Sequence, residues 1–118
     1  MDTTVTQKVE PTELTDANFK SEISTGFTFV DFWADWCPPC KAVGPTIDEL
    51  AVEWAGKVKF GKLDTDANPG VTQEFKIMSI PRFIMFKDGE KVADELGAMP
   101  KPRFDKMIKD AYEANGGI

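Results

Sequence analysis

Phe27 to Lys41 reads FTFVDFWADWCPPCK, and this stretch decides how the chain folds. Its first part, Phe27 to Trp33, is aromatic or β-branched with a single charge, a composition typical of a strand buried on both faces. Later apolar residues recur at helical spacing and predict an amphipathic helix from Pro38 to Ala55. Pro45 is expected to kink this helix, and Gly56 to cap its C-terminus. The helical apolar residues are Val43, Ile47, Leu50, Ala51 and Trp54.

The segment before this stretch predicts a short strand and a short helix. Pro11 places the strand, at about Glu10 to Leu14, on a sheet edge, because proline cannot donate a hydrogen bond to an interior ladder. Thr15 or Asp16 is then expected to cap the helix. The apolar residues on its buried face are Phe19 and Ile23.

The rest of the chain continues the alternation of strands and helices. Predicted in order are a strand at Val58–Asp64, a short helix at Asn68–Phe75, strands at Arg82–Lys87 and Lys91–Leu96, and a helix from about Pro102. Asp88 and Gly89 form a two-residue turn that favours a hairpin between the last two strands. The first strand–helix–strand segment predicts a right-handed parallel crossover. The predicted fold class is therefore α/β, a central mixed β-sheet flanked by helices on both faces.

Length and composition predict one domain. The chain has 118 residues, of which 42% are hydrophobic, enough for one core. We expect a domain at residues 8–114, a flexible segment at residues 1–7 and a short tail at residues 115–118. Because no apolar run approaches the roughly 18 residues of a membrane span, and no signal-like segment is visible, a cytoplasmic protein is expected. We also expect a monomer. The net charge of −6 disfavours binding to nucleic-acid phosphates.

The cysteine count limits the chemistry of the chain. Zinc sites usually take four Cys or His ligands, and this chain has two cysteines, Cys37 and Cys40, and no histidine. Zinc would therefore require a second subunit. A disulfide closing so small a loop removes only about 2 kcal/mol of unfolded-chain entropy, so it would be a poor structural crosslink. In a cytosolic chain, a CxxC pair beside a strand–helix–strand unit is more typical of thiol–disulfide exchange.

The predicted helix start gives the two cysteines different roles. Cys37 would occupy the N-cap, where the unpaired amides of the first turn favour its thiolate, the form that attacks a disulfide. Cys40 lies one turn later and would face inward, placed to attack the mixed disulfide that Cys37 forms with a substrate. We therefore interpret Cys37 as the nucleophile and Cys40 as the resolving cysteine.

Asp31 is the charged residue of the central strand. A carboxylate buried there costs several kcal/mol unless it is protonated or paired, so its pKa should be raised toward the range useful for proton transfer. Such a group is suited to accept the proton that Cys40 must lose before it attacks. The alternative is that Asp31 faces solvent at a strand end, although Phe29 and Trp33 share its strand face and are both apolar.

The segment Val30–Lys41 (VDFWADWCPPCK) resembles the active-site segment of the thioredoxin family. Further matches follow in order between about Leu14 and Tyr112: Pro45 matches the helix-kinking proline, Lys62 the lysine near the buried carboxylate, Ile80–Pro81 the cis-proline loop, and Gly97 and Ala98 the substrate groove. The resemblance implies the thioredoxin fold and a redox-active disulfide between the two cysteines. The catalytic residues that it implies are Cys37, Cys40, Asp31 and Lys62.

The same resemblance implies how a substrate would bind. Ile80–Pro81 should be a cis peptide that faces the disulfide, whereas base rates alone favour a trans loop proline. A shallow apolar patch around Cys37 is expected to bind many protein disulfides loosely. Two alternatives stay open: Trp36 as a simple packing residue, and Lys62 as a solvated charge at a strand end. The expected patch residues are Trp36, Ile80, Pro81, Gly97 and Ala98.

Two positions depart from the family pattern. Pro38 replaces the usual glycine after the first cysteine, and with Pro39 it is expected to modulate the redox potential. We expect the wild-type chain to be a weaker reductant than its Pro38→Gly variant, since glycine adapts more easily to ring closure. Arg82 replaces the usual threonine after the cis-proline. Its charge is expected either to bias partner choice toward acidic surfaces or to lie exposed at a strand end.

The predicted function is that of a general protein-disulfide reductase without a bound cofactor. Its expected partners are disulfide-containing protein substrates and a flavin- and NADPH-dependent thioredoxin reductase. A disulfide oxidant or isomerase on the same fold is the first alternative, and a redox potential well above that of glutathione would favour it. A binding subunit that does not use its thiols is the second. An unchanged cellular phenotype after both cysteines are replaced by serine would favour that subunit.

Overall fold

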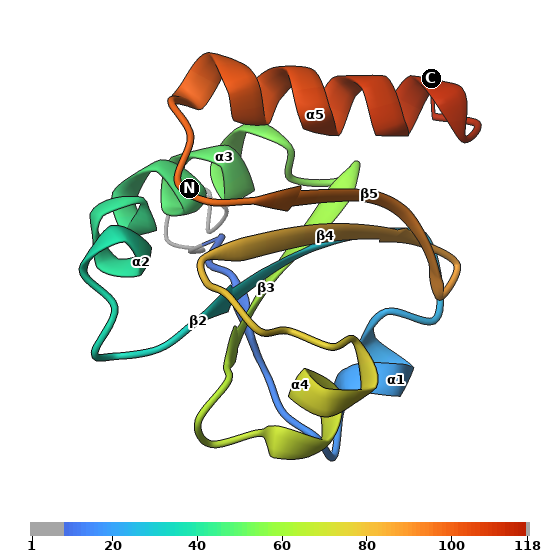
Figure 1. The fold of residues 1–118 in the computed structure, drawn as a ribbon. Coiled ribbons are helices and arrows are strands. Elements are labelled where there is room, and N and C mark those ends of the chain that lie inside the picture. Colours follow the sequence, from blue (N-terminus) through green and yellow to red (C-terminus); the bar gives the residue numbers. More distant parts are fainter. Residues whose placement is uncertain (1–8, 118) are drawn as a thin grey trace, which may run out of the picture.

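The computed structural model describes residues 9–117, which form a mixed five-stranded sheet in the order β1-β3-β2-β4-β5 (Figure 1). β1, β3 and β2 are parallel, while β4 and β5 are antiparallel to their neighbours. The predicted α/β class is confirmed, with β2 at the centre and β1 at an edge. The strands are β1 (Thr12–Leu14), β2 (Phe27–Trp33), β3 (Val58–Asp64), β4 (Arg82–Lys87) and β5 (Glu90–Leu96).

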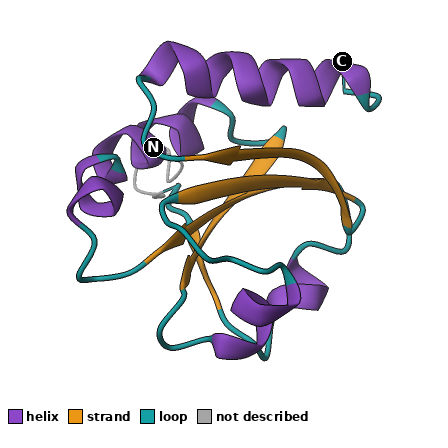
Figure 2. Cartoon of the chain, viewed as in Figure 1, coloured by secondary structure: helices purple, strands orange, loops and turns teal. Residues whose placement is uncertain are grey.

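Helices cover both faces of this sheet, as predicted (Figure 2). α3 and α5 pack on one face, and α1 and α4 pack on the other. α2 follows β2 directly and leads into α3. The helices are α1 (Phe19–Glu22), α2 (Pro38–Ala42), α3 (Gly44–Glu53), α4 (Pro69–Glu74) and α5 (Lys101–Ala114).

Two apolar cores lie on opposite faces of β2 because successive side chains of a strand point in opposite directions. Phe29 of β2 lies in the core beneath α3 and α5, stacked on Phe60 and Phe83. Phe32 lies in the other core, with Phe19 of α1. Phe29 and Phe32 are both fully buried. The near-absence of polar residues in this strand is therefore explained by burial on both faces.

The hairpin between β4 and β5 turns at the predicted Asp88–Gly89 pair. Asp88 and Gly89 have φ values of 50° and 87°, the left-handed conformation that a tight hairpin turn requires. The Asp88 carboxylate also accepts a hydrogen bond from the Gly26 amide at 2.7 Å. β5 begins at Glu90, one residue before the predicted start.

The predicted single helix from Pro38 to Ala55 is instead two helices, α2 and α3, separated at Val43. Pro45 has no N–H to donate to the carbonyl of Lys41, so the helical ladder is interrupted there rather than bent. The second helix ends at Glu53, and Gly56, with φ of 85°, reverses the chain after it. The proline was correctly expected to disturb the helix, but the size of the disturbance was underestimated.

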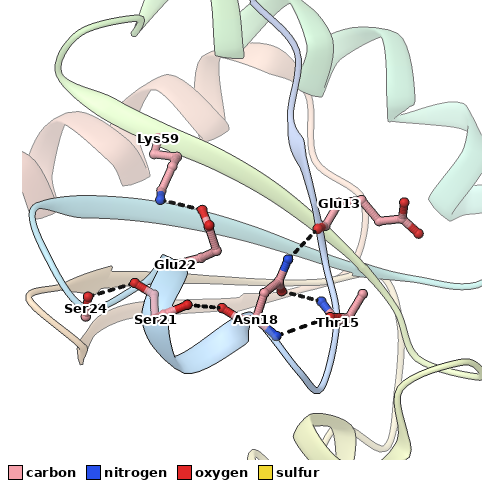
Figure 3. A network of polar contacts seen from close by, with 7 residues as sticks. All are labelled: Glu13, Thr15, Asn18, Ser21, Glu22, Ser24 and Lys59. Atoms are coloured by element: carbon pink, nitrogen blue, oxygen red, sulfur yellow. Dashed lines mark hydrogen bonds and ion pairs between the residues drawn. The ribbon is translucent and has the colours of Figure 1, made fainter.

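The predicted cap of the first helix is confirmed in part. Asn18 directly precedes α1 as its N-cap residue, but its side chain makes no cap hydrogen bond to the helix. Thr15 makes the capping hydrogen bonds one turn earlier, and Asp16 does not. Thr15 Oγ1 accepts a hydrogen bond from the Asn18 amide at 3.2 Å, and Asn18 Oδ1 accepts one from the Thr15 amide at 2.7 Å (Figure 3). The same asparagine donates to the Glu13 carbonyl oxygen at 3.1 Å, which ties the turn to β1. Asp16 instead bonds to α4, far along the chain.

Within residues 9–117, no helix is long and apolar enough to cross a membrane. The expected flexible segment at residues 1–7 lies outside the described residues. α5 ends at Ala114, where the short tail was expected to begin. α5 starts at Lys101, so Pro102 is its second residue rather than its first.

Candidate functional site

Cys37 and Cys40 form a disulfide at the start of α2, immediately after β2. Cys37 is the N-cap residue, and its Sγ accepts a hydrogen bond from the Cys40 amide at 3.3 Å. Pro38 and Pro39 between them have no N–H group, so Cys40 supplies the first amide of the helix. Both cysteines are buried, each with only 3% of its surface exposed. The predicted N-cap position of Cys37 is confirmed.

The loop before β4 lies against the disulfide. Ile80–Pro81 is a cis peptide, as the family resemblance implied, and the Ile80 carbonyl oxygen lies 3.9 Å from Cys37 Sγ. Ile80 also packs against the apolar cluster that contains both cysteines. The Pro81 carbonyl oxygen accepts a hydrogen bond from the Gly97 amide at 2.8 Å. Gly97 has φ of 95°, a left-handed conformation that favours glycine.

A groove beside the disulfide is lined by Trp36, Ile80 and Met78, together with polar residues. The Trp36 side chain is 67% exposed, so the alternative that it is a packing residue is wrong. Its indole Nε1 donates a hydrogen bond to the Asp66 carboxylate at 2.9 Å. Met78 is 91% exposed. Sequence reasoning missed both Asp66 and Met78, although an apolar residue between Lys76 and Ser79 was a usable signal.

The expected apolar patch is only partly assembled on one surface. Trp36 and Ile80 share the groove, and Gly97 is joined to Pro81 by a hydrogen bond. Pro81 itself is buried, so it contributes shape rather than accessible surface. Ala98 is exposed next to Gly97. The roles of these residues in substrate binding stay predictions.

Asp31 is fully buried on β2, and neither of its carboxylate oxygens has a hydrogen-bond partner within residues 9–117. Burial raises its pKa to about 7. The charge of Lys62 opposes this rise, and the charge of Asp48 on α3 adds to it. The predicted burial and raised pKa are confirmed, and the alternative of a solvent-facing Asp31 is wrong.

Lys62 lies opposite Asp31 in the parallel register between β2 and β3. Its Nζ lies 5.1 Å from the centre of the Trp33 ring, within the range of a cation–π contact. Lys62 is half-buried and borders a small pocket with Glu13 and Asp64. It is therefore not a freely solvated strand-end charge. Its proposed catalytic role stays a prediction.

Arg82 is neither a free cation in the groove nor an exposed strand-end charge. Its Nε and Nη2 donate to the two carboxylate oxygens of Asp94 at 2.9 and 2.7 Å. Its Nη1 donates to the Lys76 carbonyl oxygen at 3.3 Å. The hydrogen bond from Arg82 is the main cause that lowers the pKa of Asp94. Sequence reasoning singled out Arg82 but did not predict this partner.

Comparisons with known proteins agree with this geometry. Residues 10–110 match the family model described as thioredoxin. The chain is 45% identical to a thioredoxin of Staphylococcus saprophyticus over 97 residues, which are 82% of this chain and 93% of that protein. It is 43% identical to a thioredoxin of Staphylococcus aureus over 96 residues, 81% of this chain and 92% of that protein. The chain therefore belongs to the thioredoxin family of dithiol–disulfide reductases.

Proposed function

We propose that this chain is a general protein-disulfide reductase in which Cys37 attacks the substrate and Cys40 resolves the intermediate. The observation that carries this assignment is the position of Cys37 at the N-cap of α2, where its sulfur accepts a hydrogen bond from the Cys40 amide. An amide donor and the positive end of a helix both stabilise a thiolate. Cys40 lies one turn into the helix, on its buried side.

The proposed reaction has two exchanges. The Cys37 thiolate attacks one sulfur of the substrate disulfide, and the other substrate sulfur leaves as a thiolate. Cys40 then loses its proton and attacks Cys37 Sγ in the mixed disulfide. The Cys37–Cys40 disulfide forms, and the second substrate sulfur leaves as a thiolate. Two electrons pass from the dithiol of this chain to the substrate.

We propose Asp31 as the group that accepts the proton of Cys40. Its burial on the strand that leads to Cys37, and its pKa of about 7, support this role at neutral pH. Lys62, in register with Asp31 on the neighbouring strand, limits the rise of that pKa and so keeps the carboxylate available as a base. Direct contact between Asp31 and Cys40 is not needed if a water molecule relays the proton.

The electron donor and the location of the chain follow from the same proposal. The oxidised form must be reduced again, and a flavin- and NADPH-dependent thioredoxin reductase is the proposed donor. We propose one domain at residues 8–114 and a monomeric chain that acts in the cytoplasm, where dithiols are kept reduced. The net charge of −6 favours protein partners over nucleic acids.

The test is reduction of insulin by the pre-reduced chain and by two serine variants. Cys37→Ser should abolish reduction, while Cys40→Ser should stop after the first exchange and accumulate a mixed disulfide, detected by mass spectrometry. A mixed disulfide trapped by Cys37→Ser instead would reverse the two assignments. Equilibration with glutathione separates the alternatives, because an oxidant would have a potential well above that of glutathione.

A further inference from the structure

The loop at residues 76–81, here called the cis-proline loop, connects α4 to β4 and carries one wall of the groove. Met78 and Ile80 line the groove together with Trp36, and the Ile80 carbonyl oxygen lies 3.9 Å from Cys37 Sγ. A substrate segment that approaches Cys37 must therefore fit against this loop. The position of the loop fixes the shape of the groove.

Few hydrogen bonds restrain the middle of this loop. At its start the Ile77 amide donates to the Thr72 carbonyl oxygen at 2.9 Å, and at its end the Gly97 amide donates to Pro81 at 2.8 Å. The backbones of Met78 and Ser79 make no hydrogen bond within residues 9–117. The conformation between these ends therefore depends on how firmly the ends themselves are held.

Arg82 holds both ends at once. Its backbone directly follows Pro81, and its guanidinium Nη1 donates to the carbonyl oxygen of Lys76, the first residue of the loop. The guanidinium is itself fixed by two hydrogen bonds to Asp94 on β5, and both side chains are only 22% exposed. One planar side chain thus ties the loop to the neighbouring strand.

We propose that Arg82 is a positioning residue, which holds the cis-proline loop in the shape that accepts a protein disulfide beside Cys37. This inference rests on the proposed function. It assigns Arg82 an effect on substrate binding through the loop, without contact with the substrate. An arginine is required because a lysine ammonium has no rigid fork to bond the Asp94 carboxylate in two places and the Lys76 carbonyl together.

The kinetic test compares two substrates of the pre-reduced chain. For Arg82→Lys we expect the half-saturating concentration of insulin to rise about fivefold, the low end of coupling between linked sites, with the maximal rate little changed. The rate with dithiobis-nitrobenzoate, a small disulfide that does not need the groove, should stay within about twofold. Asp94→Asn removes the charge and one of the two acceptor oxygens that hold the guanidinium, without changing Arg82. It should raise the half-saturating concentration of insulin in the same direction.

Lys91→Met is the matched control. Lys91 donates a hydrogen bond to Asp94 at 2.8 Å but makes none to the loop. Its replacement should therefore leave the half-saturating concentration of insulin and the rate with dithiobis-nitrobenzoate unchanged. Unchanged insulin saturation in both Arg82→Lys and Asp94→Asn would overturn the proposal. An equal fall in the rate of reduction of both substrates would also overturn it, because the effect would then lie in the chemistry of Cys37. If the wild-type chain reduced neither substrate, the proposed function itself would fail.

Amide hydrogen exchange tests the positioning directly and does not depend on activity. In Arg82→Lys the amides of Ile77 and Gly97, at the two ends of the loop, should exchange about fivefold faster than in the wild type. The Phe29 amide in the central strand should be unchanged. Equal acceleration at all three amides would mean a general loss of stability, and it would contradict a local role for Arg82.

Discussion

Asp31 links stability to catalysis at the scale of a single side chain. Its carboxyl is fully buried without a hydrogen-bond partner in the described part of the chain, and burial raises its pKa from 3.8 to about 7. A raised carboxyl pKa means that the folded state binds the proton more tightly than the unfolded state. This group therefore contributes stability below about pH 4, and that contribution is lost as the pH rises toward 7.

Asp31→Asn should raise stability and slow turnover. The variant lacks the ionisation penalty, so its advantage in free energy of unfolding should grow between about pH 4 and 7 and reach about 4 kcal/mol. Urea unfolding at several pH values measures this. Release of the mixed disulfide should slow because the proton acceptor is missing. If Asp31→Asn turned over at the wild-type rate at neutral pH, Asp31 would not be the general base.

Sequence reasoning succeeds for Asp31 and fails for the partner of Arg82, for a physical reason. A charged residue inside an apolar strand is visible as a local pattern, and burial alone raises its pKa. The pairing of Arg82 with Asp94 depends on the hairpin register, in which Arg82 lies opposite Leu96 and Ile84 opposite Asp94. A bulge between Met85 and Phe86 sets that register, and no local sequence pattern predicts the bulge.

At the scale of elements, α4 is capped by a residue from the start of the chain. The Asp16 carboxylate accepts hydrogen bonds from the Gly70 and Val71 amides at 3.0 and 2.8 Å. The Asp16 amide in turn donates to Asn68 Oδ1 at 2.9 Å. This exchange of hydrogen bonds anchors α4, and therefore the start of the cis-proline loop, to the β1–α1 turn.

Asp16→Ala should lower the free energy of unfolding by about 1 kcal/mol, the usual cost of losing an N-cap side chain. Asp16→Asn, which keeps an oxygen acceptor, should lose less. Urea denaturation at neutral pH measures both. If Asp16→Ala lowered the free energy of unfolding no more than the exposed control Ala17→Ser does, the cap would contribute nothing to stability.

The end of α4 carries a backbone strain that a glycine would relieve. Lys76 has φ of 53°, and the hydrogen bonds from Lys76 to Gln73 and from Ile77 to Thr72 are those of a left-handed helix cap that usually holds glycine. Lys76→Gly should therefore raise the free energy of unfolding by about 1 kcal/mol. Gln73→Gly, at an exposed position inside the same helix, should lower it by a similar amount. A loss in both variants would mean that position 76 is not strained.

Element types and most strand bounds followed from sequence patterns, whereas helix ends and caps did not. The central strand and its parallel neighbour, residues 27–33 and 58–64, have the predicted bounds. The long helix divides at Val43, and Asp16 caps α4 instead of α1. The helix divides because Pro45 has no N–H for the helical ladder. The cap differs because Asp16 accepts hydrogen bonds from distant backbone amides, which a pattern of apolar spacing does not encode.

At the scale of the whole molecule, the sheet brings the site together at one end. β2 leads through Ala34 to Cys37, β3 leads to Asp66, and the cis-proline loop enters β4 (Figure 1). The carboxyl ends of parallel strands meet at the same edge, where the loops of an α/β sheet usually form the binding site. Three separate segments of the chain therefore meet around the disulfide, and none of them forms the groove alone.

The two cores on either side of the sheet should act as one cooperative unit because β2 and β4 contribute to both. Phe104 of α5 packs against Phe29 and Phe83 in one core, and Phe86 of β4 packs against Phe19 in the other. Both residues are fully buried. Removal of either ring leaves a cavity that the surrounding side chains fill only partly.

Phe104→Ala and Phe86→Ala should each lower the free energy of unfolding by about 3 to 5 kcal/mol. Each variant should still unfold in a single urea transition, with coincident curves from far-ultraviolet circular dichroism and tryptophan fluorescence, since neither core can persist without the strands that it shares. Val52→Ala, at an exposed position on α3, should change stability by no more than about 0.5 kcal/mol. Separate transitions in Phe86→Ala would instead show that the core beneath α3 and α5 is stable by itself, and that the sheet joins two units rather than forming one.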